Sequence, residues 1–260
     1  MKVIAVLGEE PLQRALAAKI HEAVPLAHVA RVQMQSKRRP RKLGQSLVSV
    51  TIGRGLRRAW AGLQRHYDDS FPGWPAVETS IHDSANSEAL AGLIERERPD
   101  LVVVSGTDLL KRTTIERFGT QVMNLHTGIS PYIRGGPNCT NWALVLGEFD
   151  LVGNTIMWID TGIDTGAIIA TERTPLTGRE SLAELHLKVM DHAHDLYRRA
   201  IQALAQGKEL PAVPQASIAK GRLFLSREWN GRAIARAAFN HRFRYRPFKN
   251  RPEIRLVPLD

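Results

Sequence analysis

The sequence predicts an α/β protein with a doubly wound, mostly parallel sheet. Short apolar runs alternate with segments whose apolar residues recur at helical spacing. The run Leu101–Ser105 is apolar throughout, as expected for a parallel strand buried on both faces. Strand and helix alternate in this way up to about Leu146, which is typical of a Rossmann-like core.

Each element is predicted from its local pattern. Leu12, Leu16 and Ile20, for example, follow one face of a helix. Strands are expected at Val3–Leu7, Ala27–Val32, Ala76–Ser80, Leu101–Ser105, Gln121–Leu125, Leu151–Ile159 and Ala167–Thr171. Helices are expected at Pro11–Ala23, Asn86–Arg98, Leu110–Phe118, from Gly136–Pro137 to Leu146, and at Ser181–Ala205.

Residues 47–75 are harder to assign. The stretch Leu47–His66 is ambiguous, because Val48–Ile52 is β-like in composition whereas Arg54–Gln64 has helical spacing. Asp68–Pro75 contains two prolines and a glycine and is expected to be a loop.

The composition is that of a globular protein, with 43% hydrophobic and 24% charged residues. No apolar run approaches the ~20 residues needed to span a bilayer. The apolar start is short and runs into Glu9 and Glu10, so we interpret it as a strand and not a signal peptide. Cys139 is the single cysteine, which suits a reducing compartment, and we expect a cytoplasmic protein. No zinc-type Cys/His cluster is visible, so we expect no metal.

The net charge of +10 favours anionic partners, such as nucleic acid, a nucleotide-linked substrate or a polyglutamylated folate. A solvated arginine-rich surface is the alternative interpretation. Lys37–Lys42 holds five basic residues around a proline and is expected to be an exposed loop that could touch a phosphate.

The composition changes after residue 205, so we predict a main domain at 1–205 and a small basic and aromatic extension at 206–260. Its arginines and aromatics are Arg222, Arg227, Arg232, Arg236, Arg242, Arg244, Arg246, Arg251, Arg255, Trp229, Phe239, Phe243, Tyr245 and Phe248. The aromatics could form a satellite core with the arginines outside, which we favour. They could also stack on bases while the arginines neutralise phosphates.

Asn124 and His126 end an apolar run two residues apart, so on a strand both side chains point to the same face. The turn residues that follow place the histidine at a strand end, where open α/β sheets bind ligands. Asp164, in a later Asp-Thr-Gly turn, is a candidate partner for the histidine. Taken singly, each has a structural alternative: a strand-end cap, a core histidine and a turn residue.

The order of motifs is more specific than any of its parts. Asn124-x-His126, the loop from Ser130–Pro131 to Arg134–Pro137, and Ile163–Gly166 resemble the formyltransferases that use 10-formyltetrahydrofolate. That family includes methionyl-tRNA formyltransferase, glycinamide ribonucleotide transformylase and the sugar N-formyltransferases. The resemblance covers roughly residues 99–187, and the first 98 more loosely.

The resemblance implies that Asn124, His126 and Asp164 are the catalytic trio and that 10-formyltetrahydrofolate is the formyl donor. We prefer Asp164 to Asp160, in its own Asp-Thr-Gly, because the next strand follows Asp164 directly. The resemblance also implies a folate pocket lined by Gly106, Thr107, Asp108, Met157, Trp158, Ile159, Asp160, Gly162 and Ile163.

Formyl transfer builds negative charge on the formyl oxygen, and a donor aimed at that atom stabilises the transition state. Asn124 offers an amide and protonated His126 a second donor. A histidine can also carry the proton from the attacking amine to the leaving nitrogen. Asp164 would orient the imidazole and raise its pKa.

The substrate is predicted from two departures. Gly8–Pro11 carries two carboxylates where glycinamide ribonucleotide transformylase has a phosphate-binding loop, and 55 residues after 205 are too few for the β-barrel domain of methionyl-tRNA formyltransferase. We therefore predict a sugar N-formyltransferase acting on a nucleotide-linked amino sugar, which by resemblance would serve surface polysaccharide (O-antigen, lipopolysaccharide) synthesis. The alternatives are an atypical methionyl-tRNA formyltransferase and a non-catalytic folate-binding protein. We expect no nucleic acid partner, and a homodimer is a candidate assembly.

Overall fold

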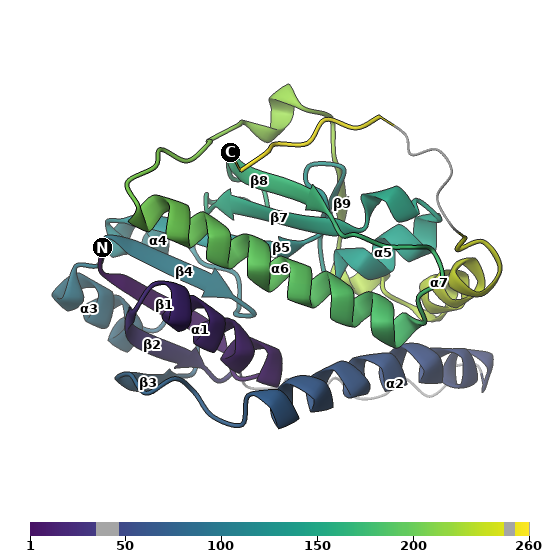
Figure 1. Cartoon of the computed structure of the whole chain (residues 1–260), viewed down its shortest axis with the longest axis horizontal. Helices are drawn as coiled ribbons and strands as arrows, with labels where there is room; N and C mark the ends of the chain where they lie inside the picture. The colour runs from purple at the N-terminus through teal and green to yellow at the C-terminus, as the bar shows by residue number, and fades with distance from the viewer. Residues whose placement is uncertain (35–46, 247–252, 260) are drawn as a thin grey trace.

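A computed structural model describes residues 1–34, 47–246 and 253–259 and confirms the predicted fold class. A seven-stranded sheet, ordered β3-β2-β1-β4-β5-β7-β8, forms its centre, with helices on both faces (Figure 1). Neighbours from β3 to β5 pair in parallel, whereas β7 and β8 are antiparallel to theirs. The sheet is therefore mostly parallel, as predicted.

The bounds of the elements are as follows. The strands are β1 (Val3–Gly8), β2 (Leu26–Val32), β3 (Thr79–His82), β4 (Leu101–Ser105), β5 (Gln121–Thr127), β6 (Ile133–Gly135), β7 (Gly153–Trp158), β8 (Ile168–Arg173) and β9 (Arg222–Phe224). The helices are α1 (Pro11–Ala23), α2 (Leu47–Ser70), α3 (Glu88–Glu97), α4 (Arg112–Phe118), α5 (Cys139–Leu146), α6 (Leu182–Ala205) and α7 (Gly231–Phe243). Short 3₁₀ helices are η1 (Phe149–Leu151), η2 (Gln215–Ser217) and η3 (Ser226–Glu228). Strands β6 and β9 form a separate two-stranded sheet.

Each face of the sheet has its own core. Helices α1 and α6 cover one face, where Leu16, Ile20 and Leu196 pack on the strands. Helices α3 and α4 cover the other, with Leu90 and Phe118 buried there. Alternate residues of β1 belong to one core and then the other, so the continuous apolar run in the sequence serves both.

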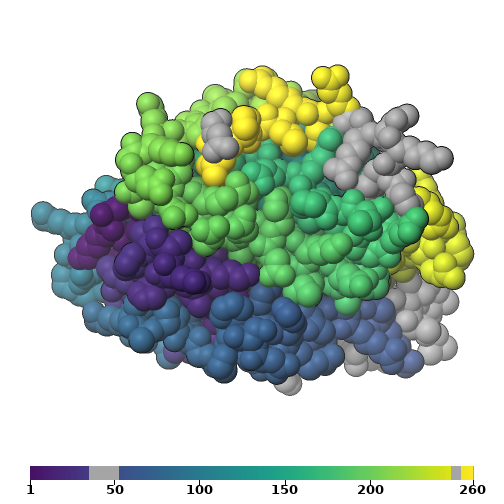
Figure 2. Space-filling view, viewed as in Figure 1, coloured from purple at the N-terminus to yellow at the C-terminus, as the bar shows by residue number. Residues whose placement is uncertain are grey.

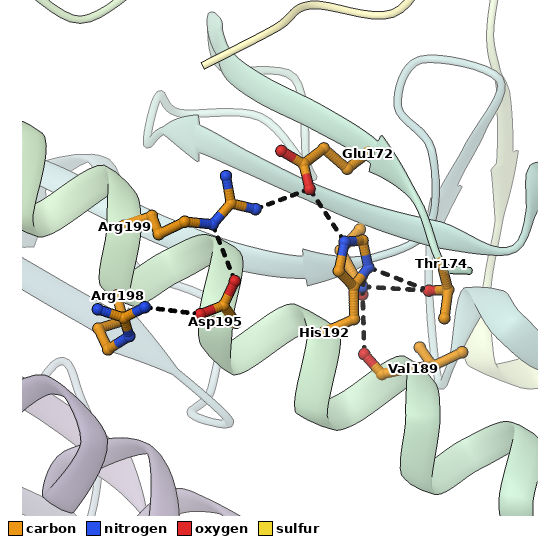
Figure 3. A network of polar contacts seen from close by, with 8 residues as sticks. Glu172, Thr174, Val189, His192, Asp195, Arg198 and Arg199 are labelled. Carbon is orange, nitrogen blue, oxygen red and sulfur yellow. Dashed lines mark hydrogen bonds and ion pairs between the residues drawn. The ribbon is translucent and has the colours of Figure 1, made fainter. Parts of the chain in front are cut away.

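Helix α6 is held to β8 by the polar network that Figure 3 shows. The Glu172 carboxylate accepts hydrogen bonds from His192 Nε2 at 3.0 Å and Arg199 Nη2 at 2.7 Å. Asn154 donates to His192 Nδ1, so the proton of the neutral ring lies on Nε2, facing Glu172. These hydrogen bonds, the one from His192 first, lower the pKa of Glu172 to about 2.

Because a neutral amide replaces the carboxylate that accepts from His192 and pairs with Arg199, Glu172→Gln should lower the free energy of unfolding by about 1–2 kcal/mol at pH 7. A carboxylate with a depressed pKa stabilises the fold above its unfolded value, near 4.5, and stops doing so as the pH falls toward 2. The difference from native should therefore shrink over that range in denaturant titrations. Glu116→Gln, which breaks an exposed ion pair with Arg112, is the control and should cost under about 0.5 kcal/mol.

The structure resolves one ambiguous stretch and shows two predicted boundaries to be wrong. The β-like stretch Val48–Ile52 lies inside α2, a single helix to Ser70, so the loop predicted from Asp68 begins at Phe71. Its buried residues recur at helical spacing (Leu56, Ala59, Leu63 and Tyr67), and this packing outweighs local β propensity. Strand β3 begins three residues after the predicted Ala76.

The start of α5 also differs from the prediction. Asn138 caps the helix by accepting a hydrogen bond from the Thr140 amide, so Pro137 lies before the helix and not in its first turn. A polar cap that satisfies a free helix amide determines this start more strongly than the preference of proline for early positions.

Described residues after 205 pack against the rest of the chain. Helix α7 contacts α5 and α2, and Phe224 stacks on Trp142 of α5 with ring centroids 4.5 Å apart. Val213 and Val257 hydrogen-bond to β8, and residues 253–259 lie on the outer surface (yellow at the top of Figure 2). The division of the chain at residue 205 stays a prediction, and Lys37–Lys42 lies outside the described residues. Within the described part of the chain, no helix is long and apolar enough to cross a bilayer.

Candidate active site

Strand β5 brings the first two candidate residues to one edge of the sheet. Asn124 and His126 lie on its same face, opposite Met157 and Thr155 of the antiparallel neighbour β7. Both line a cavity of about 1600 Å³, and Asp164, from the loop between β7 and β8, lines it too. The structure thus brings all three predicted residues to one cavity.

His126 and Asp164 form a close pair. His126 Nδ1 lies 3.5 Å from Asp164 Oδ2, and the two side chains are 8% and 18% exposed. The other ring nitrogen, Nε2, lies 3.4 Å from the carbonyl oxygen of Ile133. Both nitrogens therefore face acceptors, an arrangement that suits the doubly protonated ring.

The charge state of His126 follows from this pairing. Burial by itself lowers the pKa of the imidazole, but the Asp164 carboxylate opposes this and raises it well above the ordinary value of 6.5. The ring is therefore an imidazolium at neutral pH, with protons to donate and none to accept.

The side chains of Asp160 and Asp164, which lie in the same loop, make different contacts. Asp160 Oδ1 accepts hydrogen bonds from the Gly162 amide at 3.0 Å and the Thr165 hydroxyl at 2.6 Å, so it braces the loop from within. Asp164 Oδ2 instead accepts from the Gly135 amide at 2.9 Å and faces His126. Of the two aspartates, Asp164, which the sequence favours, is thus the one that faces His126.

Thr155 holds the loop at Gly128, which lies beside the imidazole. Thr155 Oγ1 donates to the Gly128 carbonyl at 2.6 Å and accepts from the Ser130 amide at 2.9 Å. Gly128 has a φ of +147°, and a Cβ there would lie 3.0 Å from His126 Nε2 and 2.6 Å from Cys139 Cβ. This loop therefore needs a glycine, and Cys139 is buried against it. Sequence reasoning missed Thr155, because no local signal marks a threonine that hydrogen-bonds 25 and 27 residues away.

The predicted folate-pocket residues all line the same cavity as the three polar residues: Gly106, Thr107, Asp108, Met157, Trp158, Ile159, Asp160, Gly162 and Ile163. The carboxylate of Asp108 is already engaged, because Ser84 Oγ at 2.6 Å, the Ala85 amide at 2.8 Å and Asn86 Nδ2 at 2.9 Å donate to it. The Asp108 carboxylate therefore already has its hydrogen-bond partners within the protein.

The cavity is also lined by α2 and by the C-terminal part of the chain, which the sequence did not predict to contribute to it. Helix α2 contributes Arg57, Trp60 and Arg65 to its wall, and Trp229 and Ile234 come from the C-terminal part of the chain. The ambiguity of residues 47–66 concealed the contribution of α2.

The first turn lacks the features of a phosphate loop. The Glu9 carboxylate accepts two hydrogen bonds from the Arg31 guanidinium, both at 2.9 Å, and Glu10 accepts one from Gln64 at 2.9 Å. Both glutamates line the cavity, so this part of the wall is acidic.

The sequence model of the formyl transferase family matches residues 29–201, about two thirds of the chain. The chain belongs to this family. A methionyl-tRNA formyltransferase from Syntrophus aciditrophicus is 34% identical to this chain over 128 residues, which are 49% of the chain and 40% of the relative. The chain thus spans less than half the length of the curated relative it matches.

Solved structures share the fold of this chain over most of their length. The N-formyltransferase from Helicobacter canadensis, in complex with folinic acid and dTDP-3-aminofucose, gives a TM-score of 0.59 at 17% identity and covers 94% of this chain and 82% of its own. A sugar N-formyltransferase from a Shewanella species gives 0.55 at 14% identity and covers 99% of each chain. These likenesses show the fold.

Proposed function

We propose that this protein transfers a formyl group from 10-formyltetrahydrofolate to the amine of a nucleotide-linked amino sugar. The observation that carries the proposal is the meeting of Asn124 with the His126–Asp164 pair in one cavity. The structurally similar Helicobacter protein, bound to a folate and a nucleotide-linked amino sugar, supports the choice of substrates.

The folate derivative would supply the formyl group, and Asn124 and His126 would act on its oxygen. Negative charge builds on that oxygen as the amine attacks, and each well-placed donor is typically worth ~3 kcal/mol. Asn124 offers its amide protons and the His126 imidazolium its N–H. When the bond to the leaving nitrogen breaks, His126 gives that nitrogen a proton and then takes the proton that the amine loses. Asp164 holds the ring in place throughout and stabilises it when it is charged.

The folate side of the cavity is proposed to be the wall of β4, β7 and the loop before β8. Met157, Trp158 and Ile159 offer apolar surface for a flat ring, and the backbone at Gly106–Asp108 and Gly162 offers polar groups at the strand ends. These residues fit a pterin.

The acceptor side is proposed to lie between α2 and α7. A pocket for one small ligand typically has a volume of roughly 300–1000 Å³, so a cavity of about 1600 Å³ has space for two substrates. Trp60 and Trp229 can stack on a base, and Arg57 and Arg65 can neutralise a diphosphate.

The role of the α2 arginines can be tested by reversing one charge. Arg65→Glu should raise the KM for a nucleotide-linked amino sugar about 10-fold, corresponding to ~1.4 kcal/mol of lost binding, with little change in the KM for 10-formyltetrahydrofolate. Arg58→Glu is the matched control, because Arg58 is an exposed residue of α2 that does not line the cavity. Equal effects of the two variants would point to net charge and count against the acceptor site.

A methionyl-tRNA formyltransferase is the second candidate, favoured by the 34% identity to such an enzyme. The deciding experiment measures tetrahydrofolate release from 10-formyltetrahydrofolate with a panel of nucleotide-linked amino sugars and, separately, with charged initiator tRNA. Turnover with a sugar alone supports the proposal, and turnover with tRNA alone replaces it with the second candidate. Folate binding without turnover on any acceptor would favour a non-catalytic folate-binding protein.

A further inference from the structure

Gln215 reaches the Asp164 loop from the C-terminal part of the chain. It begins η2 and is 6% exposed. Its side-chain Nε2 donates hydrogen bonds to the backbone carbonyls of Asp164 and Gly166, both at 2.8 Å. One amide group thus holds the chain on both sides of Thr165.

The backbone of η2 is itself anchored beside this loop. Val213, two residues before Gln215, exchanges two hydrogen bonds with Ile168, at 2.8 and 2.9 Å. Ile168 is two residues beyond Gly166, so the donor and the carbonyls that it contacts are attached to the same end of β8. The Gln215 amide therefore has little freedom to move away.

Gln215 holds Asp164 in a backbone conformation that is unfavourable for aspartate. Asp164 has a φ of +50°, in the left-handed region, which costs a non-glycine residue of order 1 kcal/mol. In that conformation its carboxylate reaches both the Gly135 amide and His126. Gly166 is equally constrained, because a Cβ there would lie 1.7 Å from the Trp158 carbonyl oxygen.

Stability alone does not account for a glutamine at this position. Its other amide atom, Oε1, is buried and has no hydrogen-bond partner among the described residues. A buried polar atom without a partner costs about 1–3 kcal/mol, which offsets much of what the two donated bonds contribute. The Nε2 group of the amide is thus satisfied by two carbonyl acceptors, whereas its oxygen gains nothing from burial.

We propose that Gln215 is a positioning residue that sets the Asp164 carboxylate against His126, so that the C-terminal part of the chain takes part in organising the active site. The role rests on the proposed function, since Gln215 acts through Asp164 and touches no substrate. It assigns to residues after 205 a function that their basic and aromatic composition does not suggest.

Gln215→Leu and Gln215→Met test the proposal, because both remove the donor and keep a side chain of similar size. We expect kcat to fall about 10–100-fold, the usual effect of removing a group that orients an active-site residue, while the KM for 10-formyltetrahydrofolate stays within about 3-fold. In NMR titrations the His126 ring should release its proton at lower pH than in the native protein, because the carboxylate is no longer held beside it. Ser217→Ala, in the same 3₁₀ helix and exposed, is the control and should change neither quantity.

The NMR titration needs no substrate, so it separates this proposal from the formyl transfer itself. An unshifted His126 titration in a folded Gln215 variant overturns the positioning role, whatever the acceptor proves to be. Loss of folding in both variants also overturns it, because Gln215 would then serve the fold and not the carboxylate. A shifted titration in a protein that transfers no formyl group would retain the role of Gln215 and reject the proposed reaction.

Discussion

His126→Asn should lower kcat about 10³-fold or more while the protein stays folded and binds folate normally. A general acid–base group contributes typically 10²–10⁴-fold, and His126 would serve both as a donor to the formyl oxygen and as the carrier of the proton. Asparagine keeps a polar group at the position, but its amide neither takes up nor releases a proton and carries no positive charge. The measurement is the steady-state release of tetrahydrofolate with the acceptor identified by the panel.

The control for this variant is His66→Asn. His66 is exposed on α2 and does not line the cavity, so its replacement should leave kcat unchanged. Folding of His126→Asn is checked by thermal unfolding and by the dissociation constant for folinic acid. A folded variant with near-native kcat would show that His126 has no catalytic role and is a buried structural histidine.

The parts of the fold that sequence predicts well are those determined locally. Strand β4 and helix α1 have the predicted bounds. An unbroken apolar run marks the strand and apolar residues on one face mark the helix, and both patterns can be recognised within the segment itself. Helix α2 was ambiguous because its described contacts are with α1, α6 and α7, elements far away in the sequence. No window of neighbouring residues contains that information.

In the candidate site too, some features follow from the local sequence and others depend on contacts between distant residues. The two-residue spacing of Asn124 and His126 places them on one face of a strand wherever that strand lies. The choice of Asp164 over Asp160 depended on resemblance, because both stand in Asp-Thr-Gly. What separates them physically is a set of contacts to Gly135, His126 and, through the backbone, Gln215, up to 51 residues away.

Asp164→Asn should reduce activity about 10²–10³-fold at pH 8, and the loss should shrink as the pH falls. Burial lowers the pKa of His126, and the Asp164 carboxylate is the largest of the contributions that raise it above its ordinary value. Without that charge, burial is opposed only by the smaller contributions of Cys139 and the Ile133 carbonyl, so the pKa falls and more of the rings are neutral at pH 8, unable to donate both protons. Acidification restores the imidazolium, so the variant should recover part of its rate toward pH 5.5.

Asp160→Asn is the matched control for this prediction. An asparagine oxygen can still accept from the Gly162 amide and the Thr165 hydroxyl, so the brace inside the loop is kept. The two variants make the same chemical change four residues apart, in the same tripeptide context. An Asp160→Asn rate near native, beside an Asp164→Asn rate that falls steeply as the pH rises, would locate the effect in the charge that faces His126. Equal losses with the same pH dependence would show that the loop needs both carboxylates for its shape and that Asp164 has no separate electrostatic role.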